Sequence, residues 1–550
     1  MMTFFPFVIV LAFGVHKAFG QEEGEDFTRR DRTALLYSTK FLFTPDQIPI
    51  INVLVSEGQK EARFRADGAM RFEPEGEGGS IIEVGRTKGC VATIRESKPA
   101  KLSYYVALAR IPAKDMEAIR KERAKWEQRG ITTKTFERGS VFGFFGRLLD
   151  NRVVIVVEGR PFETRGEAER RMEEITREHK DATVGLFEEL LERPFGIIEV
   201  RCEGLNAKMT FAGMVVVKGD GLLEVEGVEY GKGFPWHGRE TRRYKGSLIF
   251  APDRHGLLAV INAVDAEVFL KGLVPSEIYV DAPMEALKAQ AVCARGELFA
   301  KLGQRHTADP YMVCADVHCQ VYRGAGRENK RTSEAVDKTR GEMLFYREQL
   351  VDSVYSANCG GHTEDGVNVW LGESHAYLKG MPDTADRARV LFDAAQESQV
   401  KVFLEKPPAN IYCNSEKWGK GSFRWMVTVS SEEIRKGVAE QTGNDPGKVK
   451  DLVVLKRGKS GRALEVKVVG ERCEVILSGE LRIRKALGKL KSSLFVVEKD
   501  GKSGFTFIGG GFGHGVGMCQ IGAIGMAEKG KDYKEILRHY FGDVEILRIY

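Results

Sequence analysis

Alternating apolar and polar residues recur through much of the chain and predict short β-strands separated by turns. Three runs near the N-terminus show the pattern clearly: 51–55, 62–65 and 80–84. Strand-like runs return over 205–270 and 395–505, whereas 270–390 mixes helical patterns with loops. We therefore expect an α+β fold, with a β-rich core and helices near an active cleft.

Residues 99–202 form a distinct unit in this pattern. Its expected elements alternate as βαββαβ: 102–109, 113–129, 132–137, 152–158, a helix from Thr164 as N-cap to His179, and 195–200. This order predicts a small ferredoxin-like domain. The connection 139–151 is longer and more apolar than such a domain requires. Whether the unit is inserted into the core or lies between core segments stays open.

A glycine-rich run, 509–523, carries His514 and Gln520 and precedes a helix-forming segment over 527–540. Glycine permits positive φ and close backbone approach, so the run is suited to form a wall of a substrate cleft. The alternative is a turn that packs a strand against a helix.

Composition narrows the function classes. The chain has 550 residues with 43% hydrophobic and 29% charged residues, which is typical of soluble globular proteins with several domains. The net charge of +5 is too small to indicate nucleic-acid binding. Nine cysteines do not make a disulfide framework, and an odd count leaves at least one free or metal-bound.

The first twenty residues predict an export signal. An apolar run over 4–15 precedes Ala18-Phe19-Gly20, a small-x-small cleavage pattern. The alternative, an uncleaved anchor, is disfavoured because the run is short for a bilayer span. We expect a signal peptide over 1–20, a leader or linker over 21–50, and no membrane span after cleavage.

A second chemistry-bearing segment surrounds Glu277. We expect this glutamate on a loop before a helix that Asp281 caps, with Ala286, Ala289 and Cys293 on a small-residue face suited to close packing. Burial could raise the pKa of Glu277 enough for a general acid, although the nearby helix N-terminus favours the anion. The alternative is a surface glutamate in a turn.

A third segment contains four soft metal ligands within fourteen residues: His306, Cys314, His318 and Cys319. Two thiolates and two imidazoles form a reasonable set for a structural zinc ion. Because neighbouring side chains often point apart, either His318 or Cys319 could lie outside the ligand set, or water could be the fourth ligand. A Cys314–Cys319 disulfide and two buried free thiols are the alternatives. No other cofactor is expected.

The Val274-Pro275-Ser276-Glu277 segment, the helix that follows and the distant Gly-His-Gly-Val-Gly-Met-x-Gln-x-Gly-Ala motif together resemble the SpoIID/LytB family. The matching stretches cover about 51–80 and 208–550, which implies a SpoIID-type core built from 51–98 and 205–550. The family contains lytic transglycosylases that cleave peptide-free glycan strands, and LytB-type proteins that enhance amidases.

The resemblance assigns roles residue by residue. It makes Glu277 the catalytic acid and places these residues at substrate-binding positions: Arg295, Gln320, Tyr377, Lys379, His514 and Gln520. Some members carry a metal in the segment that holds His306 and Cys314. Cys519 stands where we expect serine.

The 99–202 unit resembles a SPOR domain, and the Gly159-Arg160-Pro161-Phe162 turn is the best match. SPOR domains bind peptide-free glycan. Together the resemblances imply an exported, periplasmic or wall-associated lytic transglycosylase that leaves 1,6-anhydro-N-acetylmuramic acid ends. Its process would be division, wall remodelling or sporulation. The alternative is a non-catalytic enhancer or scaffold of an amidase. Expected partners are glycan strands and an amidase or division-machinery protein, but no nucleic acid.

Overall fold

The computed structural model describes residues 32–550, except 39, 41, 77–78, 145–146, 180–181, 232–236, 317, 371–374, 388–391 and 502–503. The expected signal peptide, 1–20, and residues 21–31 of the leader lie outside the described residues. The fold is α+β and rich in strand, as the hydrophobic pattern predicted.

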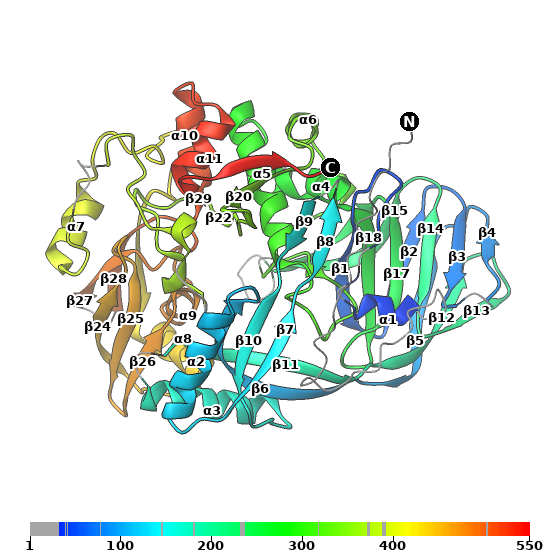
Figure 1. Cartoon of the computed structure of the whole chain (residues 1–550), viewed down its shortest axis with the longest axis horizontal. Helices are drawn as coiled ribbons and strands as arrows, with labels where there is room; N and C mark the ends of the chain where they lie inside the picture. Colours follow the sequence, from blue (N-terminus) through cyan, green and yellow to red (C-terminus); the bar gives the residue numbers. More distant parts are fainter. Residues whose placement is uncertain are drawn as a thin grey trace, which may run out of the picture.

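Two large sheets face each other to form the sandwich on the right of Figure 1. The first has the order β19-β1-β18-β17-β14-β3-β4 and the second β13-β12-β5-β2-β15-β16. Phe64 and Phe250, with ring centroids 4.6 Å apart, help to fill the core between them. The strands span Ile50–Gln59 (β1), Glu61–Ala66 (β2), Met70–Pro74 (β3), Ile82–Val84 (β4), Cys90–Lys98 (β5), Phe195–Cys202 (β12), Lys208–Ala212 (β13), Val215–Gly219 (β14), Leu223–Tyr230 (β15), Gly238–Tyr244 (β16), Ser247–Pro252 (β17), Leu258–Asp265 (β18) and Val313–Cys314 (β19), with helix α1 at Arg32–Leu36.

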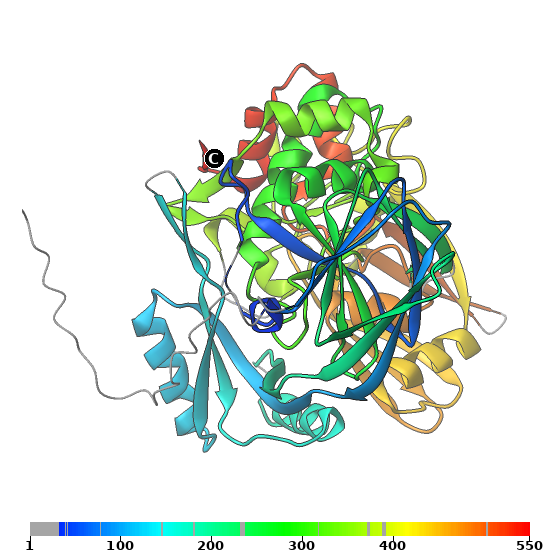
Figure 2. The same ribbon diagram turned by 90° about the vertical axis from the view of Figure 1, so that its right-hand side faces the viewer.

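A separate four-stranded sheet, ordered β11-β6-β10-β7, carries two helices on one face (Figures 1 and 2). Its elements are β6 Lys101–Pro112, α2 Met116–Gln128, β7 Thr133–Arg138, β10 Val153–Glu158, α3 Arg165–Glu178 and β11 Gly185–Glu192. Thr164 caps α3 through a capping box with Glu167. The last strand of this sheet is therefore β11, and the prediction that 195–200 supplies it was wrong. Residues 195–202 instead form β12, which pairs with β5 in the sandwich.

The four-stranded unit is an insertion in the sandwich. Strands β5 and β12 are antiparallel neighbours, and Cys90 and Cys202 are opposite each other and disulfide-bonded. The chain leaves the sandwich after β5 and returns to it at β12, so 101–192 lie between two paired strands. A disulfide suits the oxidising compartment that an export signal would imply.

The long apolar connection 139–151 forms a β-hairpin that reaches the core. Strands β8 (Val141–Phe144) and β9 (Arg147–Asp150) pair with each other and run towards the long central helix in Figure 1. Phe142 and Leu149 are buried in the main hydrophobic cluster, and the Asn151 amide donates to the carbonyls of Phe299 and Leu302. The hairpin thus attaches the insertion to the core, which explains its apolar character.

Helix α5 (Met284–Lys301) is the centre of the helical region, in contact with α4, α6, α10, α11 and β20. Ala286, Ala289 and Cys293 are fully buried on it, as their spacing predicted. Its N-cap is Pro283 rather than Asp281. The surrounding elements are α4 Ala266–Glu277, η1 Ala325–Arg327, α6 Lys330–Lys338, β20 Glu342–Tyr346, β21 Gln349–Leu350, β22 Tyr355–Ser356, η2 Gly366–Asn368, η3 Ala376–Leu378, β29 Met518–Cys519, α10 Gln520–Glu528, α11 Tyr533–Phe541 and β30 Glu545–Arg548. The single helix expected over 527–540 is divided between α10 and α11, with Gly530 at a φ of 82° between them.

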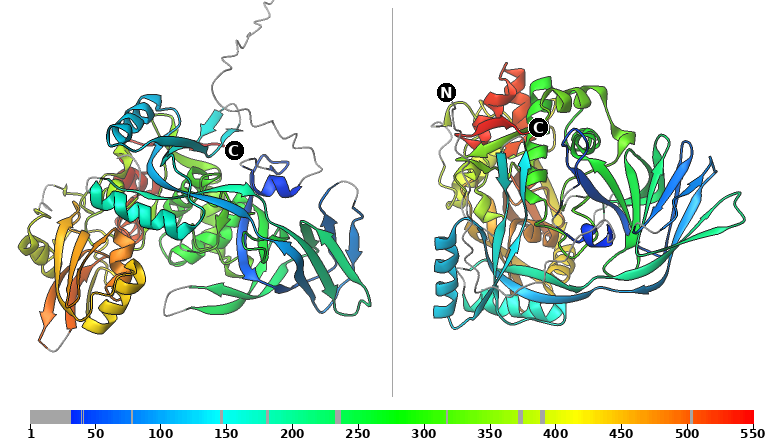
Figure 3. Two further views of the ribbon diagram at one scale, coloured as in Figure 1. Left: turned by 90° about the horizontal axis from the view of Figure 1, so that it is seen from below. Right: turned by 45° about the vertical axis from the view of Figure 1, so that its right-hand side comes forward.

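The remaining residues form a lobe with its own core, at the lower left of Figure 1 and the left of the view from below in Figure 3. Its elements are β23 Arg424–Ser430, α8 Ser431–Thr442, β24 Val449–Arg457, β25 Ala463–Gly470, β26 Glu474–Ser478, α9 Glu480–Ala486, β27 Phe495–Asp500 and β28 Gly504–Gly510. Helix α7 (Glu397–Glu405) packs against β27, and its buried side chains belong to the main hydrophobic cluster. Strand β28 leads directly into the glycine-rich run. Among the described helices, none combines the length and apolar character needed to cross a membrane.

Candidate active site

Glu277 is the last residue of α4 rather than part of a loop, so the loop prediction was wrong. Asp265 caps the helix by accepting from the Val268 N–H, and buried apolar residues along α4 hold it against the core. The backbone becomes extended at Ile278. This position reverses the expected electrostatics, because the C-terminal end of a helix carries partial negative charge and disfavours an anion.

The Glu277 carboxyl is suited to hold a proton near neutrality. Burial raises its pKa to about 7, and the nearby Glu297 carboxylate adds to the rise. Two hydrogen bonds act in the opposite direction: the Val321 N–H donates to Oε1 at 2.7 Å, and the Tyr355 hydroxyl is also a partner. Burial outweighs both, so Glu277 can change protonation state close to pH 7.

A buried polar network extends from Glu277. The Gln320 amide donates to the Tyr355 hydroxyl at 3.2 Å and to Glu297 Oε2 at 3.2 Å, and Lys301 Nζ donates to Glu297 Oε1. Sequence reasoning identified Gln320 but missed Glu297, Lys301 and Tyr355. A signal was available for two of them, because Glu297 and Lys301 are an i,i+4 charge pair within a helix of small and apolar residues.

Gln520 supports the same glutamate through its backbone. As the first residue of α10, it donates from Nε2 to the Glu277 carbonyl at 3.1 Å and to Gln290 Oε1 at 3.1 Å. Both glutamines are buried. Gln520 therefore joins the glycine-rich run to the end of α4, and its amide acts on the position of Glu277 rather than on a substrate.

His514 lies in the glycine-rich run with its ring half-buried and 4.8 Å from the Trp370 ring. Its Nδ1 accepts from the Val516 N–H at 3.0 Å. Burial lowers its pKa to about 3, helped by the charges of Arg462 and Lys301, so the imidazole is neutral at physiological pH. Such a ring can donate a hydrogen bond but does not supply a proton for catalysis.

The glycines beside His514 are required by close packing. Gly515 has a φ of 75°, and a Cβ there would lie 2.2 Å from Cζ of the buried Arg462. Gly517, with a φ of 71°, would place a Cβ 2.1 Å from the Val354 carbonyl oxygen. The run therefore presses against the backbone that leads into Tyr355, which brings His514 close to the network.

Tyr377 faces a cavity of about 440 Å³ between the core and the insertion. Its ring stacks on His375 at 4.9 Å, and Lys301 and Trp370 share the cavity wall. Because Lys301 also binds Glu297, the cavity adjoins the Glu277 network. Lys379 is exposed two residues further on and does not line this cavity.

Arg295 does not face the cleft. Its side chain is fully buried on α5 and forms a bidentate ion pair with Glu267, with N–O distances of 2.7 and 2.8 Å. The Tyr550 hydroxyl donates to the same carboxylate at 2.6 Å. The substrate-binding role that the resemblance implied therefore does not fit this position, and the structure gives Arg295 a packing role.

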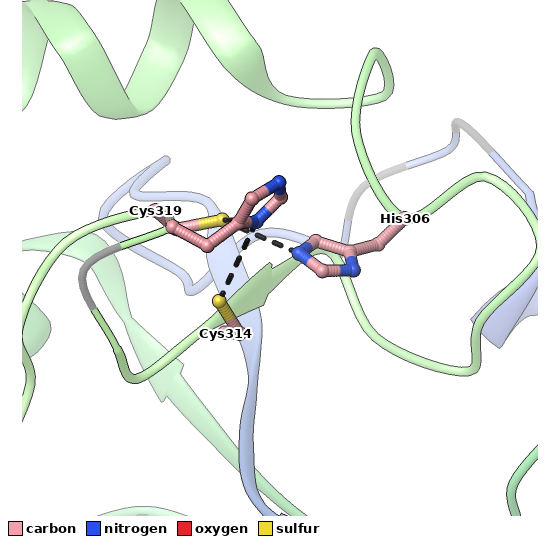
Figure 4. A group of neighbouring side chains, drawn as sticks. His306, Cys314 and Cys319 are labelled. Carbon is pink, nitrogen blue, oxygen red and sulfur yellow. Dashed lines mark hydrogen bonds between the residues drawn. The ribbon is translucent and has the colours of Figure 1, made fainter. Parts of the chain in front are cut away.

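The four predicted metal ligands converge. Their ligand atoms all lie within 4.8 Å of one another, and Figure 4 shows His306, Cys314 and Cys319 turned towards each other. His306 Nε2 is 3.3 Å from Cys319 Sγ, and His318 Nδ1 is 3.5 Å from the same sulfur. The adjacent His318 and Cys319 thus both point inward, and two sulfurs with two imidazole nitrogens fit a tetrahedral zinc ion.

Comparison with known proteins places this site in a family. The family model described as Stage II sporulation protein matches residues 254–346, which include Glu277, Gln320 and the metal ligands. An uncharacterized protein of Brachyspira hyodysenteriae is 33% identical over 57% of this chain and 74% of its own length. A Stage II sporulation protein D of Bacillus subtilis is 25% identical over 56% of this chain and 81% of its own length. The chain belongs to the SpoIID/LytB family.

Two further matches show how much of the chain is similar to other proteins. The amidase enhancer of Bacillus subtilis is 29% identical over 50% of this chain, which spans only 39% of that protein's length. A domain of unknown function (DUF8618) matches 364–517, which includes Tyr377, Lys379 and His514. Helix α4 with Glu277 and the first part of the glycine-rich run, up to residue 517, thus lie in segments that match family models.

Proposed function

We propose that this SpoIID/LytB protein is a lytic transglycosylase that cleaves peptidoglycan glycan strands stripped of stem peptides. The observation that carries the proposal is the Glu277 carboxyl, whose pKa of about 7 lets it act as an acid and then as a base. Membership of the SpoIID/LytB family supports a role related to peptidoglycan.

In the proposed reaction, protonated Glu277 donates its proton to the glycosidic oxygen as the bond to N-acetylmuramic acid breaks. Positive charge develops on the sugar ring, and the new carboxylate then takes the proton of the sugar's own 6-hydroxyl. The 6-oxygen bonds to the anomeric carbon and closes a 1,6-anhydro ring. Glu297 is held by Lys301 and Gln320, so it is poorly placed to activate a water as the second carboxylate of a hydrolase would.

A structural zinc ion held by His306, Cys314, His318 and Cys319 fits this scheme. The ion would neutralise the two thiolates and tie the loop that carries them. His306 Nδ1 is hydrogen-bonded to Asp309 Oδ2 at 3.0 Å, and a carboxylate of this kind commonly orients a zinc-bound histidine. Because Gln320 and Val321 follow Cys319 directly, this loop positions both groups that contact Glu277 and its network.

We further propose that the inserted four-stranded unit binds glycan. On the face opposite its helices, the rings of Tyr105, Phe136 and Phe187 cluster, with centroids 4.6 to 6.3 Å apart. Lys134 Nζ lies 4.3 Å from the Phe136 ring centroid. Tyr105 and Phe187 are buried and Phe136 is half-buried, so Phe136 is the ring of this cluster that offers a face to a sugar. An aromatic face flanked by polar groups is suited to stack on a sugar ring.

We expect Phe136→Ala to weaken binding of purified peptide-free glycan roughly tenfold, since the truncation removes about 1–2 kcal/mol of ring contact. Binding is measured by co-sedimentation with denuded sacculi. Met116→Ala, on the exposed surface of α2, is the matched control and should bind as the wild type. If both variants weakened glycan binding equally, the aromatic face would not be the binding site.

The decisive experiment on the activity is mass spectrometry of products from peptide-free glycan strands. Fragments ending in 1,6-anhydro-N-acetylmuramic acid would support the transglycosylase, whereas reducing ends would indicate a hydrolase. Binding without cleavage would favour the amidase-enhancer alternative, which the similarity to the Bacillus subtilis amidase enhancer supports. An exported location, in the periplasm or wall, and a role in division, remodelling or sporulation belong to the same proposal.

The rate of cleavage should fall as the pH rises through about 7. The acid form of Glu277 is present below its pKa of about 7, so kcat/KM should drop about tenfold per pH unit above it. Glu297→Gln removes a neighbouring negative charge, which favours the Glu277 anion and should move this break to lower pH. A kcat/KM profile from pH 5.5 to 9 measures both, with the exposed Glu334→Gln as the unchanged control. A flat profile up to pH 9 would contradict the assignment of Glu277.

A further inference from the structure

A second group of metal-ligand side chains lies away from the predicted zinc loop. Cys359, Asp383, Cys413 and Cys519 come from distant parts of the chain, yet their ligand atoms all lie within 4.8 Å of one another. All four residues are completely buried. No local spacing motif connects them, so only the fold brings them together.

The distances suit coordination better than a disulfide. The sulfurs of Cys359 and Cys413 are 3.6 Å apart. A tetrahedral zinc ion with Zn–S bonds of about 2.3 Å separates its sulfurs by about 3.8 Å, whereas a disulfide joins them at about 2.0 Å.

Neighbouring N–H and O–H groups orient two of these four side chains, Cys519 and Asp383. Cys519 Sγ accepts from the Cys359 N–H at 3.1 Å and from the Gly522 N–H at 3.3 Å, contacts that favour a thiolate. Asp383 accepts from the Cys413 N–H at 3.0 Å and from the Tyr540 hydroxyl at 2.7 Å. Outer partners of this kind orient the ligands of protein metal sites.

Burial of the Asp383 carboxylate needs a compensating positive charge. His539 Nε2, 3.7 Å from Asp383 Oδ1, supplies such a charge only when it is protonated. The backbone also makes room for this packing, because a Cβ at Gly522 would lie 2.1 Å from the Tyr540 hydroxyl and 2.7 Å from Asp383 Oδ2. A divalent cation among the three sulfurs and Asp383 would supply the charge.

The geometry points to a second structural metal site, in which Cys359, Asp383, Cys413 and Cys519 hold a zinc ion. Thiolate-rich tetrahedral sites select zinc among the common divalent ions, and the three thiols release their protons on binding. The site joins the end of β22 to β29, which pair in parallel with Ser356 opposite Cys519. It thereby holds in place the neighbouring residues Tyr355 and Gln520, both of which contact Glu277.

The test is the metal content of the full chain, purified without chelators and measured by plasma mass spectrometry. Cys519→Ser should lower bound zinc by one equivalent per chain, and Cys413→Ala should do the same. Cys473→Ser, at the exposed cysteine, is the matched control and should leave zinc unchanged. Serine is the residue the SpoIID/LytB resemblance predicts at 519, so Cys519→Ser is expected to fold.

A second measurement separates the two metal sites and does not alter the new ligands. In a Cys314→Ser/Cys319→Ser chain loaded with cobalt, the thiolate-to-cobalt absorption bands should persist. Their absence would overturn the proposal, as would a zinc content that Cys519→Ser leaves unchanged. A Cys359–Cys413 disulfide in the non-reduced peptide map of most molecules would overturn it as well.

Discussion

Glu277→Gln is expected to lower glycan cleavage by roughly 10²–10⁴-fold, the range that general acid catalysis contributes. The amide keeps an oxygen that can accept from the Val321 N–H, so the shape of the site is preserved. What is lost is the transferable proton. Turnover is measured as the release of anhydro-ended fragments from peptide-free glycan strands.

Folding stability and a matched surface variant serve as controls for this variant. Because the folded pKa of Glu277 lies above its unfolded value, its ionisation opposes folding as the pH rises through about 7. At pH 8, Glu277→Gln should therefore be as stable as the wild type or more stable. Glu334→Gln, an exposed partner of Lys338 on α6, should retain full activity. If Glu277→Gln still cleaves at the wild-type rate, Glu277 is not the acid.

Arg295→Ala is expected to destabilise the protein by about 3–5 kcal/mol, the usual effect of leaving one charge of a buried ion pair without its partner. The Glu267 carboxylate would remain buried without its guanidinium partner, and the Tyr550 hydroxyl would still donate to it. Urea unfolding followed by tryptophan fluorescence measures the loss.

A double variant tests the physical reason. Arg295→Met with Glu267→Gln removes both charges and keeps most of the buried volume, so it should recover much of the lost stability. A substrate-binding arginine would behave differently, because Arg295→Ala would then raise KM and leave the unfolding midpoint near that of the wild type. That result would return Arg295 to the role implied by the resemblance.

Local features of the chain could be predicted well. The capping box at Thr164 needs only Glu167 three residues later, and the small-residue face of α5 needs only helical spacing. His306, Cys314, His318 and Cys319 could be proposed together as metal ligands because all four lie within fourteen residues. In each case the interacting groups are close in sequence, so periodicity and spacing carry the necessary information.

The structure of the insertion shows where local patterns become insufficient. Residues 185–192 and 195–202 both have strand character, and only pairing with β6 or β5 decides which sheet each one joins. The apolar hairpin 141–150 had no explanation until its contact with the core was visible. Strand partners are set by long-range hydrogen bonds, which the alternation of side chains does not encode.

The sequence by itself determined the family motifs, and it singled out Glu277 as the candidate acid and His306, Cys314, His318 and Cys319 as candidate metal ligands. Tertiary structure decided which of these residues act together. It placed Glu297 and Tyr355 beside Glu277, removed Arg295 into the core and gathered Cys359, Cys413 and Cys519 around Asp383. The reason is physical: a pKa, a buried ion pair and a ligand cluster all depend on charges and distances between segments that only the folded chain brings into contact.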